Sequence, residues 1–293
     1  MLHSNSHISV IVPAYNAERT IADCVGSLLR QELEEDKYRI TVVDNGSQDR
    51  TGDILRGFGN RITLLSEARR GAAAVRNRGI LSGRGTLLAF IDADCVADGN
   101  WLGNIVSLLS EPGVGMVGGR ILAKSPHEPV RKFGETIHDH KRAIESCNPP
   151  YVISMNAATH REVLDKVGLF NTDFRRGEDV DLSWRILAAG YVLRYAPDAI
   201  IYHENEPRLS GLLREGCQHG YYGVKVKRRH NAYLIRSGRN RNFFGNSRRT
   251  LVDFMSYFRG RSRHEQHLYG AVFNSGKIFG SFLGSLRFGY FEI

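Results

Sequence analysis

Short apolar runs alternate with amphipathic segments through the first part of the chain. The runs at residues 8–12, 38–43, 61–66 and 86–91 are rich in branched and aromatic side chains, which favours strands. Between the runs, apolar residues recur at helical spacing, as at Ile21, Val25 and Leu28. This alternation predicts βαβ units and a parallel sheet. The run at 86–91 is almost wholly apolar, as expected of a strand buried on both faces.

The pattern is less regular further along the chain. Additional elements are expected as helices at 101–109 and 182–189 and as strands at 113–121, 191–195 and 199–203. Residues 124–150 are polar and contain four prolines, which predicts a loop or helix lying over a cleft. Beyond residue 206 the sheet pattern stops. We therefore expect an α/β domain at residues 1–205 and a helical region at 206–293.

Charge separates these two regions. Residues 206–293 hold 16 of the 40 basic residues and 5 of the 31 acidic ones, a net charge of +11, whereas residues 1–205 have a net charge of −2. Basic residues mixed with Tyr, Phe and Leu suit helices that lie on an anionic membrane surface. Packing on the core, with the arginines solvated, is an equally good explanation. No nucleic-acid-binding module is recognisable, so no nucleic-acid partner is expected.

Cysteine usage and hydropathy indicate the compartment. The four cysteines are far apart and include no Cys-X-X-Cys pair, which favours a reduced setting and argues against a structural zinc cluster. The chain starts with a polar segment, so no signal peptide is expected, and no apolar run approaches the roughly 18–20 residues of a membrane span. We expect a cytoplasmic protein, peripheral on the inner face of the membrane if its basic region binds lipid.

Polar side chains follow several predicted strands, namely Tyr15 with Asn16, Asp44, Asp92 with Asp94, and His203. The carboxyl ends of parallel strands share one edge of a sheet, where ligands bind. Asp92 and Asp94, two residues apart in an extended segment, point the same way and suit a hard divalent cation. Turn and cap roles explain Asp44 and the Asp-X-Asp tripeptide about as well on local grounds.

Other candidate groups lie on predicted helices. Glu178 and Asp179 open a helix, where the dipole favours ionised carboxylates. Arg76 lies on a helix leading toward the same edge of the sheet, although arginines on helices are usually solvated. His138 and His140 have no clear ligand spacing, and we expect both to be solvated. No Walker or Gly-X-Gly-X-X-Gly sequence occurs, which weighs against a P-loop NTPase or a dinucleotide enzyme.

Taken in order, these motifs resemble family 2 glycosyltransferases of the GT-A fold. The resemblance covers about residues 7–205. Its five main segments are 10–16 (VIVPAYN), 42–49 (VVDNGSQD), 71–79 (GAAAVRNRG), 91–94 (IDAD) and 177–182 (GEDVDL). The segment Ser154-Met155-Asn156 is similar to the acceptor-side segment of the family. The implied fold is a Rossmann-like α/β fold with a mixed, mainly parallel sheet flanked by helices, here with a basic helical C-terminal extension.

The resemblance also implies roles for individual residues. The donor nucleotide is expected to contact Pro13, Tyr15, Asp44, Arg76, Asp92 and Ala93. A Mg²⁺ or Mn²⁺ ion is expected to bind Asp94 most directly, with Asp92 and His203. Asp179 matches the catalytic base, and Asn156 and Glu178 lie on the acceptor side.

The expected reaction moves a sugar from a UDP- or GDP-linked donor to an acceptor hydroxyl, with inversion because one base faces one leaving group. The acceptor is expected to be a glycan or a lipid-linked glycan of cell-surface synthesis. The Gln-X-X-Arg-Trp motif of processive synthases is absent, which favours single transfers. Two alternatives stay open: a nucleotidyltransferase, and a non-catalytic nucleotide-sugar or lipid-binding protein of the same fold. The first lacks its basic Gly-rich loop, and the full set of acidic residues argues against the second.

Overall fold

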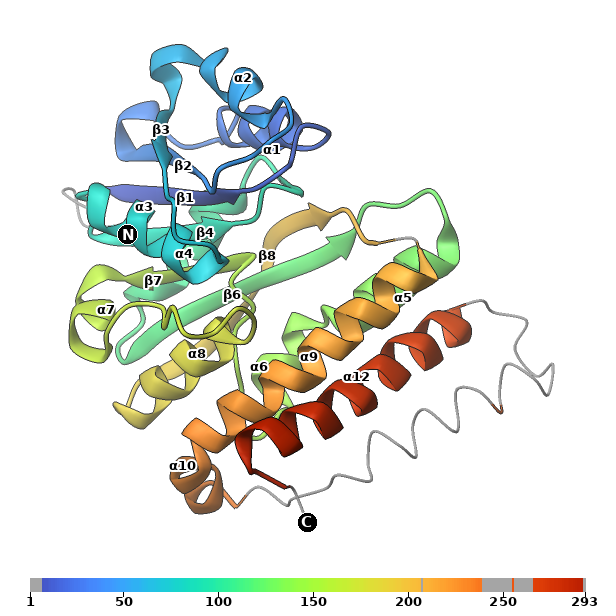
Figure 1. Cartoon of the computed structure of the whole chain (residues 1–293). Helices are drawn as coiled ribbons and strands as arrows, with labels where there is room; N and C mark the ends of the chain where they lie inside the picture. Colours follow the sequence, from blue (N-terminus) through green and yellow to red (C-terminus); the bar gives the residue numbers. More distant parts are fainter. Residues whose placement is uncertain (1–6, 207, 239–254, 256–265, 292–293) are drawn as a thin grey trace. The chain divides into compact units, whose positions relative to one another are not determined.

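The computed structural model describes residues 7–206, 208–238, 255 and 266–291 (Figure 1). The chain forms two compact units, one from Met1–Leu122 and Asp139–His203, the other from Ala123–His138 and Glu204–Ile293. The chain thus leaves the first unit, contributes one short segment to the second, and returns.

The first unit is built on an eight-stranded sheet with the order β3-β2-β1-β4-β7-β6-β8-β5. Its strands are β1 (Ile8–Ala14), β2 (Tyr38–Asp44), β3 (Thr63–Ser66), β4 (Leu87–Ile91), β5 (Cys95–Ala97), β6 (Val114–Ala123), β7 (Asn156–His160) and β8 (Val192–His203). β1 pairs in parallel with β2 and β4, and β2 with β3, whereas β7 is antiparallel to β4 and β6, and β5 to β8. The sheet is therefore mixed.

Helices cover both faces of this sheet. They are α1 (Ile21–Leu28), α2 (Thr51–Arg56), α3 (Ala72–Ser82), α4 (Trp101–Ser107), α6 (His140–Glu145), α7 (Arg161–Val167) and α8 (Glu178–Ala188). Successive residues of β1 alternate between two apolar clusters: Val10 and Val12 join one, and Ile11 joins the other. Period-2 alternation with both faces apolar is what a central strand requires. The predicted α/β class with a mixed sheet flanked by helices is confirmed.

One predicted boundary within the sheet is wrong. Residues 191–195 and 199–203 form the single strand β8 rather than two strands. Pro197 and Asp198 interrupt the apolar pattern, and the backbone stays extended through them. Both side chains are exposed there, so the polar interruption costs the strand no buried polar group.

The second unit is helical. It contains α5 (Glu128–Ile137), α9 (Leu209–Arg229), α10 (Asn231–Arg236) and α12 (Gln266–Phe288), so part of the 124–150 segment forms a helix here. Phe133 of α5, Leu212 of α9 and Phe273 of α12 form its apolar centre. Within the described residues, no helix combines the length and apolarity needed to cross a bilayer.

α9 and α12 run side by side in the same direction (Figure 1). Glycines make this possible: a methyl group on Gly216 or Gly220 would overlap the backbone of α12, and one on Gly276 or Gly280 would overlap that of α9. Close helix–helix approach of this kind needs residues without a Cβ atom at the crossing.

Candidate active site

The loops that follow β1 and β2 are joined at one edge of the sheet. Ala14 and Asp44 are register partners at the ends of these two parallel strands. The Asp44 carboxylate accepts hydrogen bonds from the backbone N–H and the hydroxyl of Ser47, at 3.1 and 2.5 Å. The Ser47 hydroxyl oxygen accepts one in turn from the Asn16 N–H at 2.9 Å. Asp44 therefore does stabilise the turn, and the same hydrogen bonds fix its carboxylate at the edge of the sheet where a ligand is predicted to bind.

An exposed ring stands at the same edge. Tyr15 is 50% exposed, and the Arg70 guanidinium lies over its ring at 4.6 Å from the centroid. Arg70 also donates to the backbone oxygen of Asn45 at 3.2 Å. The Asn45 side chain is buried and bonds the backbone of Glu67, Arg69 and Gly71, which fixes the loop that carries Arg70. The sequence analysis did not identify Arg70 or Asn45, because nothing local marks their partners.

Arg76 lies at the centre of the acidic groups. Its side chain is 3% exposed; Nη2 lies 2.6 Å from Oδ1 of Asp92, and Nη1 lies 2.9 Å from Oε1 of Glu178. One guanidinium thus joins the end of β4 to the start of α8. The usual tendency of helical arginines to be solvated does not hold for Arg76, because α3 directs this side chain inward between two carboxylates.

These carboxylates titrate abnormally because they are buried. Burial raises the pKa of Asp92, and the neighbouring charge of Asp94 adds to this, while Arg76 opposes it. Burial and the adjacent Asp179 raise the pKa of Glu178 to about 7, again against the pull of Arg76. The two carboxylates in turn raise the pKa of the Arg76 guanidinium, so Arg76 stays charged.

The side chains of Asp94 and His203 approach each other beside the β5–β8 strand pair. Cys95 and His203 are register partners in the antiparallel β5–β8 pair. As a result, Nε2 of His203 lies 3.5 Å from Oδ2 of Asp94, whose side chain is 48% exposed. Desolvation raises the pKa of Asp94, but the hydrogen bond and charge of His203 outweigh it, so the pKa is lowered overall.

A carboxylate oxygen beside an imidazole nitrogen is a donor set that suits Mn²⁺. Within the part of the chain that the structure describes, no three His, Cys, Asp or Glu side chains are grouped as a metal site. Asp92, the third predicted ligand, turns one oxygen toward Arg76 instead. The residues fit a cation held by Asp94 and His203, with further oxygen ligands from a bound diphosphate.

Asp179 is the second residue of α8, two positions after Gly177, whose φ of 81° lies in the left-handed region. Its Oδ1 accepts from the Val180 N–H at 2.8 Å and its Oδ2 from the Ser154 N–H at 3.4 Å. The Ser183 hydroxyl, which donates to the Asp179 backbone oxygen at 2.7 Å, accepts from the Val152 N–H at 3.0 Å. The base candidate is thus held against residues 152–154, next to Glu178 and therefore next to Arg76.

Comparison with known proteins shows the family of this chain. The family model for glycosyl transferase family 2 matches residues 9–168. The glycosyltransferase AglE of Haloferax volcanii is 34% identical over 224 residues, covering 75% of this chain and 73% of that protein. The chain belongs to glycosyl transferase family 2. It is a glycosyltransferase that uses a nucleotide-sugar donor.

Two further similarities extend the comparison. The pre-mycofactocin glycosyltransferase of Mycobacterium tuberculosis is 27% identical over 248 residues, covering 80% of this chain and 51% of that protein. A solved structure of the mannosyltransferase PcManGT from Pyrobaculum calidifontis, in complex with GDP-Man and Mn²⁺, superposes with a TM-score of 0.70 at 20% identity, covering 96% of this chain and 87% of that one. The GT-A-like fold is thereby confirmed.

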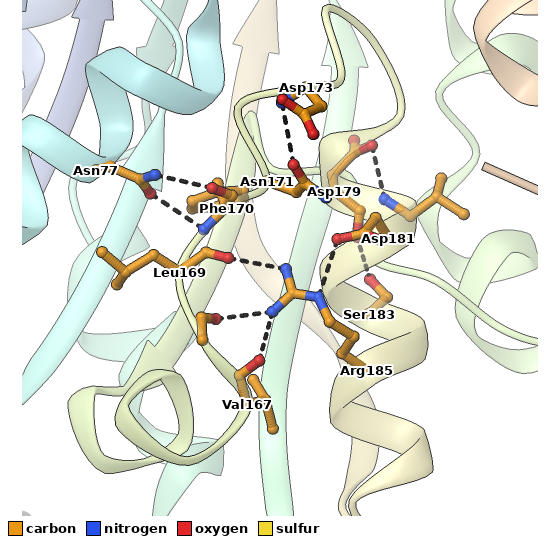
Figure 2. A network of polar contacts seen from close by, with 12 residues as sticks. Asn77, Val167, Leu169, Phe170, Asn171, Asp173, Asp179, Asp181, Ser183 and Arg185 are labelled. Atoms are coloured by element: carbon orange, nitrogen blue, oxygen red, sulfur yellow. Dashed lines mark hydrogen bonds and ion pairs between the residues drawn. The ribbon is translucent and has the colours of Figure 1, made fainter. Parts of the chain in front are cut away.

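In this glycosyltransferase, two side chains fasten the segment that leads into α8 (Figure 2). Arg185 pairs with Asp181 at 2.9 Å and donates to the backbone oxygens of Val167, Gly168 and Leu169 at 2.7, 2.8 and 2.9 Å. Asn77 bonds both the N–H and the oxygen of Phe170, at 3.1 and 2.8 Å. Asp179 therefore lies in the first turn of α8, and the segment before this helix is held by Asn77 of α3 and by Arg185 of α8 itself. Sequence analysis missed both positioning residues, although Asn77 directly follows Arg76 in a family motif.

Asn156, predicted on the acceptor side, has no exposed surface. Its Oδ1 accepts from the Trp101 indole N–H at 2.8 Å, and its Nδ2 donates to the backbone oxygens of Arg120 and Ala199 at 2.9 and 3.0 Å. All its polar atoms are thus used inside the sheet. Glu178, the second acceptor-side candidate, is also buried, against Arg76.

The expectation that His140 is solvated is wrong. It is buried; its Nδ1 lies 2.7 Å from the Gly119 backbone oxygen, and its Nε2 accepts from the Ile153 N–H at 2.8 Å. These partners fix the neutral tautomer with the proton on Nδ1. The histidine therefore connects α6 to β6 and to the segment beside Asp179.

Proposed function

We propose that this glycosyltransferase moves a sugar from a UDP- or GDP-linked donor to a hydroxyl of a glycan or lipid-linked acceptor, with inversion and with the help of Mn²⁺ or Mg²⁺. The observation that carries the proposal is the Arg76 bridge, since one guanidinium bonds a carboxylate of the Asp-X-Asp segment and the neighbour of the base candidate. The complex of PcManGT with GDP-Man and Mn²⁺ supports the donor class and the metal.

The donor would lie across the edge where β1, β2 and β4 end. Pro13, Tyr15 and Asp44 would contact the base and ribose, the exposed ring of Tyr15 offering a stacking face. Asp92 and Ala93 would line the diphosphate side, with Arg76 holding Asp92 in place from beneath. A divalent cation on Asp94 and His203 would supply positive charge to the leaving diphosphate.

Asp179 would take the acceptor proton. The acceptor oxygen forms its bond to the anomeric carbon as the bond to the diphosphate oxygen breaks, and the hydroxyl proton passes to the Asp179 carboxylate. A single base opposite a single leaving group gives inversion. Glu178, held by Arg76, and Asn156, bonded within the sheet, would keep the acceptor side in position without touching the reacting atoms.

We assign catalysis to residues 1–205 and contact with the acceptor or the membrane to residues 206–293. Residues 152–154, which contact the base candidate Asp179 and its helix, lie in the first of these regions, as does Asn156. The catalytic region is therefore discontinuous in sequence, because the segment Ala123–His138 belongs to the same compact unit as the later helices.

The test is a panel of UDP- and GDP-sugars, with and without Mn²⁺, in which release of free nucleotide is measured. One donor should give metal-dependent release, and the anomeric configuration of the product, read by NMR, should be opposite to that of the donor. Asp179→Asn should slow transfer by about 10²–10⁴-fold. Asp165→Asn, an exposed carboxylate on α7, is the matched control and should keep full activity. Full transfer by Asp179→Asn, or retention of configuration, would contradict the proposal.

A further inference from the structure

The later half of α12 carries an exposed apolar stripe, defined here as Phe279, Phe282, Leu283 and Leu286. Their exposed fractions are 57, 50, 39 and 58%. The spacing i, i+3, i+4, i+7 puts all four on one face of the helix. A different face of α12 is used for packing, since Gly276, Gly280 and Gly284 lie against α9. Four large apolar side chains gathered on one outward face form a patch of the kind that marks an interaction site.

A basic cluster lies at the same end of this helical unit. Arg228 and Arg229 end α9, and Arg236 ends α10; all three are exposed, as is the apolar Ile235. The ring of Tyr221 on α9 lies 5.1 Å from that of Phe288 on α12, and the Tyr290 hydroxyl lies 3.2 Å from Oδ1 of Asn231 on α10. These contacts place the end of α9, α10 and the end of α12 together.

The described residues at this end carry an excess of positive charge. Among the described residues after 215, seven are basic and none is acidic, the seven being Lys225, Lys227, Arg228, Arg229, Arg236, Lys277 and Arg287. A second copy docked through the stripe would bring two such basic clusters together, and repulsion between like charges costs free energy. An anionic surface with an apolar interior can bury the apolar stripe and attract the basic cluster at the same time.

We propose that this end of the helical unit docks on an anionic lipid bilayer. Phe279, Phe282, Leu283 and Leu286 enter the boundary between head groups and acyl chains, and Arg228, Arg229 and Arg236 contact lipid phosphates. α12 lies in the plane of the surface, with its glycine face still packed on α9. The tight glycine contacts keep the two helices together, so the stripe is presented as one rigid face.

The experiment is co-sedimentation of the full chain with phosphatidylcholine vesicles that contain or lack phosphatidylglycerol. Binding should require phosphatidylglycerol and should weaken as salt rises. The double variants Phe282→Ser/Leu286→Ser and Arg228→Glu/Arg229→Glu should each lower the partition coefficient by about tenfold or more. The matched controls are Leu81→Ser, 69% exposed on α3, and Arg30→Glu, exposed after α1; both should bind like the unchanged chain.

Circular dichroism and thermal unfolding of each variant show whether the helices remain folded. Absence of sedimentation with phosphatidylglycerol vesicles at low salt overturns the proposal, as does unchanged binding by the folded stripe variant. Sedimentation velocity of the chain without lipid gives the remaining outcome: a dimer that Phe282→Ser/Leu286→Ser converts to monomer assigns the stripe to a second copy instead. Lipid binding needs no sugar transfer, so this result is independent of the proposed reaction.

Discussion

Buried Arg76 and partly buried Asp92 form an ion pair in which Nη2 and Oδ1 are 2.6 Å apart. The same guanidinium bonds Glu178, so one positive charge serves one partly buried and one buried carboxylate. Burial of charge without full compensation is costly, which is why the pKa values of Asp92 and Glu178 are raised. The positions of Asp92, at the proposed donor site, and of α8, which carries the base candidate Asp179, therefore both depend on the side chain of Arg76.

Replacing Arg76 should therefore destabilise the fold as well as the site. Arg76→Met leaves Glu178 buried, and Asp92 partly buried, without a counter-charge, which should lower the free energy of unfolding by about 3–5 kcal/mol. Arg76→Lys keeps the charge but cannot bond both carboxylates in the same geometry, so it should lose less stability and still lose turnover. Urea unfolding and transfer assays measure both. Arg78→Met, exposed on the same helix, should stay within about 0.5 kcal/mol. A loss below about 1 kcal/mol for Arg76→Met would mean that the bridge contributes little.

Cation binding should depend on the contact between Asp94 and His203. Asp94→Asn and His203→Gln each remove one proposed donor, so the dissociation constant for Mn²⁺ in the presence of a nucleoside diphosphate should rise by about tenfold or more, or 1.4 kcal/mol. Titration calorimetry or Mn²⁺ paramagnetic resonance measures this without turnover. Asp98→Asn, whose carboxylate accepts from the Asn100 N–H just after β5, is the control. Equal Mn²⁺ affinity in all three variants would remove the assignment.

Two glycine-to-alanine substitutions on α9 should have opposite effects on stability, because one glycine contacts α12 and the other does not. Gly220→Ala puts a methyl group into the backbone of α12 and should destabilise the helical unit by about 1–3 kcal/mol. Gly223→Ala meets no atom within 4 Å and should stabilise it by about 0.5–1 kcal/mol, because alanine favours helix. Hydrogen exchange of α9 and α12 amides reports on this unit directly. If the two variants had the same effect, the close approach would be wrong.

His140 should make stability fall in mild acid. Burial lowers its pKa from 6.5 to about 4, so the folded chain keeps it neutral while the unfolded chain protonates it. Above pH 6.5 both states are neutral and the effect vanishes; between pH 6.5 and 4 it should cost about 1.4 kcal/mol per pH unit. The measurement is the difference in unfolding free energy between the unchanged chain and His140→Gln, which does not titrate. That difference should change with pH only in this window, and a flat difference would contradict the prediction.

Much of the fold could be predicted because it rests on local patterns. The apolar run before Asp92 is the buried central strand β4, and the apolar run at 8–12 is strand β1, whose residues alternate between two apolar clusters. The continuity of β8 could not be predicted from local pattern, because the backbone stays extended through Pro197 and Asp198 although the apolar pattern of side chains is interrupted there. The segment Ala123–His138 joins the later helices. The polar, proline-containing composition of residues 124–150 marks a break in the sheet pattern there, but it does not show which helices the segment packs with.

The partners within the site could not be predicted for a different reason. Arg76, Asp92 and Glu178 were each identified, but their mutual contacts depend on how α3, β4 and α8 pack. Asn156 and His140 are polar residues whose burial is decided by backbone groups remote in sequence. Sequence spacing identifies the residue types available at an edge of the sheet, and tertiary packing decides which of them face each other.

The β5–β8 pairing has a consequence for the order of assembly. Residue 94 leaves the ribosome well before residue 203, so a nascent chain holds only one of the two proposed cation donors. The second arrives with the last strand of the sheet, when β8 is laid beside β5. If this pair holds the cation as proposed, capture of the sugar nucleotide is deferred until the first unit has been synthesised, and a truncated chain that ends before β8 cannot bind the donor through this pair.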